Sequence, residues 1–189
     1  VQQSIPIRRI YRGGVWKVGG KFSRTWGFSD INYSVASPED QTDLFLRYSA
    51  ILNSLPTDGA AKITIVNHRL NPDEFAKTVL LPRQGDRLDE YRREYNAILT
   101  DKAGQSNNLI RDRYLTVSSV RKDGEDARAY FSRVQADLSA GFQRLGSSFA
   151  PMDNTERLRI LHDFFRAGEE PFFRFDLSET MRKGHDFRD

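Results

Sequence analysis

A strand that leads into a capped amphipathic helix, between Phe28 and Leu55, is the feature that most constrains the fold of this chain. Ser37 and Pro38 form a helix start, because the serine hydroxyl can accept a hydrogen bond from a first-turn N–H and proline has no N–H to leave unpaired. Apolar residues then recur at helical spacing, namely Leu44, Tyr48, Ile51, Leu52 and Leu55. Such a helix needs a sheet face or another helix to cover its apolar stripe.

Residues 1–28 are expected to form a β-meander in which paired glycines, Gly13-Gly14 and Gly19-Gly20, supply the positive φ angles of tight turns. Basic and aromatic residues are interleaved there; the basic residues are Arg8, Arg9, Arg12, Lys17, Lys21 and Arg24, and the aromatic ones are Tyr11, Trp16, Phe22 and Trp26. This pattern of interleaved basic and aromatic residues is typical of nucleic-acid-binding faces. Strand alternation alone also explains it, with aromatics packed inward and charges protecting a sheet edge.

The rest of the chain alternates strand and helix patterns. Strand patterns at 62–66 and 114–120 are each followed by helical ones, and a helical segment marked by Leu88, Tyr91, Tyr95, Ile98 and Leu99 is inserted between them. Asp123 is expected to open the helix after 114–120, whose apolar stripe reaches Leu145 and which Gly146 ends. Asp153 and Glu156 resemble a capping box before the last helix, whose expected apolar face is Leu158, Leu161 and Phe165. Two tandem strand–helix–strand units predict an α+β fold, with a ferredoxin-like layer of helices on an antiparallel or mixed sheet. We expect a single domain over residues 1–169, with the meander at 1–28, an α/β body at 29–169 and a tail at 170–189.

The composition is that of an ordinary globular protein. Among 189 residues, 29 basic and 26 acidic side chains leave a net charge of only +3, which is a weak indication of an anionic partner. The absence of cysteine excludes disulfides and thiolate chemistry. No apolar run approaches the ~20 residues needed to span a bilayer.

No motif in the sequence predicts a catalytic, cofactor-binding or metal-binding residue. Gly20-Lys21 is followed by Phe22, so the Gly-Lys-Ser/Thr of a phosphate-binding loop is missing. The histidines His68, His162 and His185 are far apart and have no zinc-enzyme spacing, so we interpret them as ordinary surface or core residues. His162 and Asp163 are expected to point in different directions, as successive residues of a helix do.

Several whole segments together resemble a known family. They are IPIRRIY (5–11), GFSDINYSVASPEDQTDLFLRYSAILNSL (27–55), KITIVNHRLN (62–71), LDEYRREYNAIL (88–99), AYFSRV (129–134) and ERLRILHDFFRAGEE (156–170). The chain resembles the N-terminal region of the VirB-type type IV secretion ATPases, the conjugation ATPases encoded by integrative conjugative elements, or conjugative transposons, of Gram-positive bacteria. The resemblance extends over residues 4–189 and carries no chemical motif.

The resemblance implies a non-catalytic docking and assembly domain that serves DNA transfer. In the family, a C-terminal motor with the Walker motifs binds ATP and Mg²⁺, so both cofactors are implied for that motor and none for this chain, whose tail would lead into it. The implied partners are inner-membrane channel components and further copies of the protein, at the cytoplasmic face of the membrane. We expect an exposed aromatic docking patch, with Trp16, Trp26 or Phe172-Phe173 as candidates if they are not core residues.

The sequence is also compatible with two other functions. The basic and aromatic meander could form a nucleic-acid-binding module, which predicts arginines on one face and binding that weakens steeply with salt. A free-standing enzyme is the third hypothesis, although no cluster of residues supports it. Whether the charged helix around Tyr91 packs on the body or on a neighbouring molecule is a further open point.

Overall fold

The computed structural model describes residues 6–69, 72–105, 109–176 and 179 of the chain. The chain divides into two compact units. Unit 1 comprises residues 1–64 and 113–189, and unit 2 comprises residues 65–112. The sequence suggested one domain over residues 1–169 with an inserted helical segment. That insertion lies in unit 2, which is compact in its own right.

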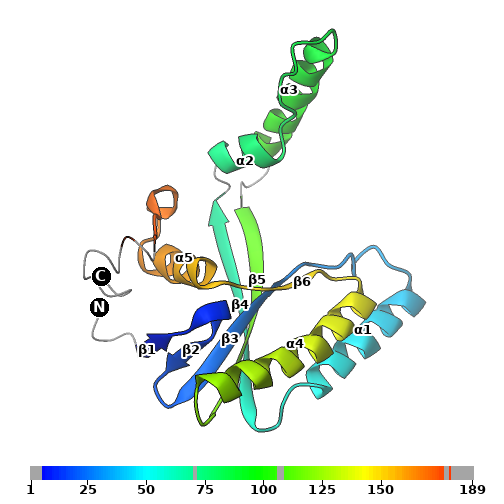
Figure 1. Ribbon diagram of the computed structural model, residues 1–189. Helices are drawn as coiled ribbons and strands as arrows, with labels where there is room; N and C mark the ends of the chain where they lie inside the picture. Colours follow the sequence, from blue (N-terminus) through cyan, green and yellow to red (C-terminus); the bar gives the residue numbers. More distant parts are fainter. Residues whose placement is uncertain (1–5, 70–71, 106–108, 177–178, 180–189) are drawn as a thin grey trace. The chain divides into compact units, whose positions relative to one another are not determined.

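The described strands form one six-stranded sheet, in which five strands follow the order β1-β2-β3-β5-β4 (Figure 1). The sixth strand, β6, pairs with residues 26–28 of β3, whereas β2 pairs with residues 21–23. The strands are β1 (Ile7–Ile10), β2 (Trp16–Val18), β3 (Lys21–Phe28), β4 (Gly59–Arg69), β5 (Leu109–Ser119) and β6 (Phe149–Pro151). β3 pairs antiparallel with β2, β5 and β6. It is therefore both the last strand of the predicted meander and the centre of the sheet.

The sheet contains two interlocked strand–helix–strand motifs. The first motif consists of β3, α1 (Pro38–Asn53) and β4, and the second consists of β5, α4 (Gly124–Leu145) and β6. β5 lies between the two strands of the first motif, and β3 lies between the two strands of the second. This is the split ferredoxin-like arrangement. The predicted α+β class is confirmed, with helices on an antiparallel sheet.

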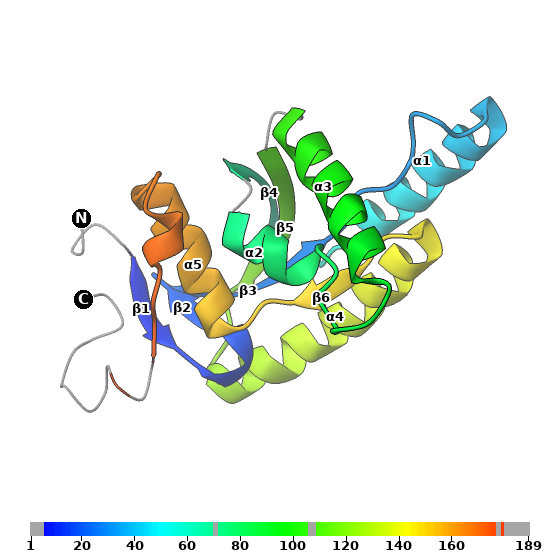
Figure 2. The same cartoon turned by 90° about the horizontal axis from the view of Figure 1, so that it is seen from above.

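Helices α1 and α4 lie side by side on one face of the sheet (Figures 1 and 2). The predicted caps are present: the Ser37 hydroxyl accepts from the Asp40 N–H, and the Asp123 carboxylate caps α4. α4 ends at Gly146, whose φ of 80° suits glycine. The core between helices and sheet consists of Val15, Phe22, Trp26, Ile51, Leu115, Val117, Ala127, Phe131, Val134, Leu138, Phe142 and Leu145.

Helix α5 (Asn154–Phe165) lies on the opposite face of the sheet. It begins with a capping box in which Asp153 and Glu156 bond to each other's backbone N–H groups. Side chains alternate along β3, so that Trp26 points toward α4 while Ser23 points toward α5, where it meets Arg157. α5 also contacts the 3₁₀ turn η2 (Arg12–Gly14).

Unit 2 contains the helices α2 (Pro72–Thr78) and α3 (Asp89–Gln105). The segment between them is fastened to α3 by the Asn96 amide, which bonds to both the N–H and the carbonyl of Leu81 at 2.9 Å. Arg92 bonds to Asp86 and Asp89 at the start of α3. One side of α3 is therefore covered by the chain that precedes it.

Candidate interaction surfaces

The aromatic residues of the meander are core residues. Trp16, Phe22 and Trp26 are all buried, and Tyr11 is half-buried against the Phe22 ring. The indole N–H of Trp26 donates to Gln135, and that of Trp16 donates to Asn154 at 3.0 Å. The suggestion that Trp16 or Trp26 forms an exposed docking patch is therefore wrong, because strand alternation turns both rings inward, one on each face of the sheet.

The same burial bears on the nucleic-acid hypothesis. Arg8, Arg9 and Arg12, here called the meander arginines, are exposed. Bases in a single strand stack on exposed aromatic rings, however, and the three buried rings of the meander cannot provide such a platform. What remains of the predicted face is exposed positive charge.

Arg157 forms a buried polar centre between α5 and the sheet. Its guanidinium donates to the carbonyls of Gly14 at 2.7 Å and Ser23 at 3.1 Å and to the Ser23 hydroxyl at 3.1 Å, and it stacks 4.1 Å from the centre of the Trp16 ring. Burial, and secondarily repulsion from Arg24, lowers the pKa of Arg157. No carboxylate among the described residues pairs with it. Its contacts hold α5 on the sheet.

A second polar cluster joins three elements at the end of β5. The Asp58 carboxylate accepts from the Tyr130 hydroxyl at 2.8 Å and forms an ion pair with Arg121, whose guanidinium stacks 3.6 Å from the centre of the Tyr130 ring. The Tyr130 hydrogen bond and then Arg121 lower the pKa of Asp58. Burial and the bond to Asp58 raise the pKa of Tyr130. The cluster fastens the turn before β4 to α4.

Of the three histidine side chains, the structure describes only that of His162. The His162 ring contacts Asp163 at 3.0 Å and lies 5.2 Å from the Phe173 ring, so these neighbouring side chains converge where the sequence suggested that they diverge. The side chain of His68 and all of His185 lie outside the described residues. Within the described part of the chain, no three histidine, aspartate or glutamate side chains are grouped so as to hold a metal ion.

Three exposed aromatic residues of unit 1 lie in or shortly after the last turn of α5. Phe172 is 73% exposed and so remains a candidate for the docking patch, whereas Phe173 is half-buried beside His162. Phe164 and Phe165 are also exposed and pack edge to face 5.1 Å apart. The sequence placed Phe165 on the buried face of this helix. α5 is instead rotated so that Arg157 is buried.

Unit 2 carries an apolar stripe along α3. Leu88, Tyr91, Tyr95 and Ile98 follow one another by three or four residues, which places them on one side of the helix. Each is more than half exposed, and Tyr91 is 67% exposed. Arg92 and Asn96, which bond to the preceding segment, lie on a different side of α3. We call these four residues the α3 stripe; its spacing was evident in the sequence, but its exposure was not.

Comparisons with known proteins add no assignment. No protein-family model matches the chain, and a comparison with curated proteins finds no relative. None of the helices in the described ranges is both long and apolar enough to cross a membrane.

Proposed function

We propose that this chain is a non-catalytic docking and assembly domain of a conjugative-transfer type IV secretion ATPase. It would act through protein–protein contacts at the cytoplasmic face of the membrane, with inner-membrane channel components and further copies of the protein as partners. ATP and Mg²⁺ would bind to the motor that follows this domain in the family. The sequence segments that resemble the family support this proposal.

The observation that carries the proposal is the exposure of the α3 stripe. Large exposed apolar patches commonly mark interaction sites, and tyrosine in particular is enriched among the residues that dominate binding energies. Tyr91 and Tyr95 each present a rigid ring with a polar tip to solvent, and Leu88 and Ile98 extend the surface along the helix. A helix with such anchors suits a complementary apolar groove on a partner.

Co-purification of the full-length protein with its membrane channel complex tests the proposal. The variant combines Tyr91→Ser, Tyr95→Ser and Ile98→Ser, which remove three anchors from exposed positions. Arg93→Ser is the matched control, because Arg93 is an exposed α3 residue outside the stripe. We expect the triple variant to lose the channel proteins and the control to retain them. Retention by both variants would refute docking through α3.

The meander arginines alone do not favour the alternative of a nucleic-acid-binding module. Sequence-independent binding combines a basic groove with exposed aromatic stacking surfaces. Trp16, Phe22 and Trp26 contribute to the core instead. Exposed arginines on a short edge strand such as β1 also serve to prevent edge-to-edge pairing, which explains Arg8 and Arg9 without a nucleic acid.

A further inference from the structure

The free edge of β4 is a second candidate surface, in unit 1 and independent of α3. β4 ends the sheet, with β5 as its neighbour among the described strands. Within unit 1 its residues are Gly59–Thr64, and every residue from Gly59 to Ile63 is exposed. This segment has no proline and one charged residue, Lys62. An edge of this kind presents unpaired backbone N–H and C=O groups to an incoming strand.

Helix α1 offers an apolar flank next to this edge. On its other side, Arg47 donates to the carbonyl of Arg144 in α4, so that side faces α4. Phe45 and Leu52 lie two turns apart on the flank of α1 opposite Arg47, and Leu52 lines a small cavity together with Ile63 of β4. Phe45 is 60% exposed and Leu52 is 41% exposed. A partner strand on β4 would therefore have an apolar wall beside it.

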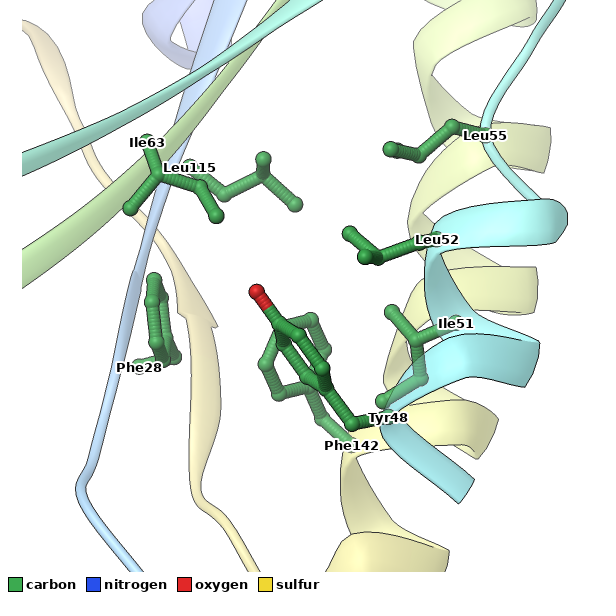
Figure 3. Close-up of a pocket in the computed structure, with 8 residues that line it drawn as sticks. All are labelled: Phe28, Tyr48, Ile51, Leu52, Leu55, Ile63, Leu115 and Phe142. Carbon is green, nitrogen blue, oxygen red and sulfur yellow. The ribbon is translucent and has the colours of Figure 1, made fainter. Parts of the chain in front are cut away.

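A small apolar cavity connects the two features. It has a volume of about 10 Å³, room for roughly one water molecule. Its walls are Tyr48, Leu52 and Leu55 on the helix side and Phe28, Ile63 and Leu115 on the sheet side (Figure 3). Ile63 is 44% exposed, so α1 covers β4 incompletely. Leu52 and Ile63, both partly exposed, therefore present apolar surface beside the β4 edge.

We propose that the β4 edge and the α1 flank bind an extended acidic and apolar segment of a partner protein by strand addition. Backbone hydrogen bonds to Gly59–Thr64 would hold the segment. Its alternate side chains would then point to opposite faces: apolar ones toward Phe45, Leu52 and Ile63, and the others toward the face that bears Lys62.

The charge of the segment follows from Lys62. This residue is exposed and has no ion-pair partner within the described ranges, and no acidic residue lies between Gly59 and Thr64. A carboxylate opposite Lys62 is complementary to it, as opposite-charge pairs across neighbouring strands stabilise a sheet. A second copy of this chain suits the edge less well, because a paired β4 edge would bring two lysines and no acid to the junction.

The test measures fluorescence anisotropy of labelled nonapeptides added to the whole chain. The peptides alternate an apolar residue, which is valine, leucine or phenylalanine in three versions, with threonine and glutamate. We expect at least one peptide to bind saturably, with a Kd below about 1 mM. Lys62→Glu and Phe45→Ser should each weaken binding by roughly tenfold or more. Leu46→Ser, on the outer side of α1, is the control and should leave binding unchanged.

Two N-methylated forms of the best peptide identify the mode of binding. One form carries methyl groups on alternate backbone nitrogens, and the other carries them one residue further along, so that each blocks hydrogen bonding along one edge of the strand. Strand addition predicts that only one of the two forms loses binding. Equal binding of both forms, failure of every peptide to bind, or dimerisation of the chain that Lys62→Glu abolishes would each overturn the proposal.

Discussion

Substitution of Arg157 by methionine tests whether a buried guanidinium without a carboxylate stabilises this fold. The guanidinium donates three hydrogen bonds, to the carbonyls of Gly14 and Ser23 and to the Ser23 hydroxyl, and it stacks on Trp16. Methionine fills a similar volume but provides no donor. The substitution therefore removes a donor from each of three acceptors in the interior.

Two effects of opposite sign set the size of the change. Each unsatisfied acceptor costs about 1–3 kcal/mol, and loss of the desolvated stack on Trp16 costs about 2 kcal/mol. Methionine in turn avoids burying a charge, a penalty of several kcal/mol whose presence is indicated by the lowered pKa of Arg157. Because three acceptors lose their donor at once, we expect Arg157→Met to lower the free energy of unfolding by about 2–4 kcal/mol.

Urea unfolding followed by far-ultraviolet circular dichroism measures this difference without relying on Trp16 fluorescence, which the substitution itself would alter. Arg133→Met is the matched control, because Arg133 is an exposed arginine of α4. It should change stability by less than about 0.5 kcal/mol. If Arg157→Met were as stable as the unsubstituted chain, desolvation of the charge would outweigh the hydrogen bonds, and the structural role assigned to Arg157 would be refuted.

Gly14→Ala should lower the free energy of unfolding by about 2 kcal/mol or more, measured by the same assay, because Gly14 has a φ of 73° and a Cβ there would collide with the Met152 carbonyl; unchanged stability would contradict this packing. Asp58→Asn should flatten the fall in melting temperature below about pH 4, since the Tyr130 hydrogen bond lowers the pKa of the folded Asp58 and its stabilisation is lost as pH falls. A slope equal to that of the unsubstituted chain would count against the Asp58 contact. Anisotropy of labelled single- and double-stranded DNA should stay flat at low salt; tight, salt-sensitive binding that the joint replacement of the meander arginines by alanine abolishes would revive the nucleic-acid hypothesis.

Local signals in the sequence predicted much of the fold. The Ser37 cap, the Asp153 capping box and Gly146 each act within a few residues, so their effect can be recognised from sequence alone. The apolar stripe of α4 likewise indicated its buried face. Two strand–helix–strand patterns in tandem then sufficed to predict a split ferredoxin-like layer.

The candidate site was less predictable, because exposure depends on contacts between distant parts of the chain. Trp16 and Trp26 could not be assigned to core or surface until the positions of α4 and α5 were known. The apolar spacing in α5 favoured a buried Phe165. Arg157 instead donates hydrogen bonds to the carbonyls of Gly14 and Ser23, so that α5 is oriented with Arg157, and not Phe165, toward the sheet. The spacing of Leu88, Tyr91, Tyr95 and Ile98 predicted a stripe but gave no indication of what covers it.

The frequency of conjugative transfer tests the proposed docking role most directly. The full-length protein would carry Tyr91→Ser, Tyr95→Ser and Ile98→Ser in donor cells, and Arg93→Ser would serve as the control at equal protein abundance. We expect transfer to fall by at least about tenfold in the triple variant, because removal of interface anchors brings a loss of this size, and we expect the control to transfer normally. Normal transfer by the triple variant would contradict a docking role for α3.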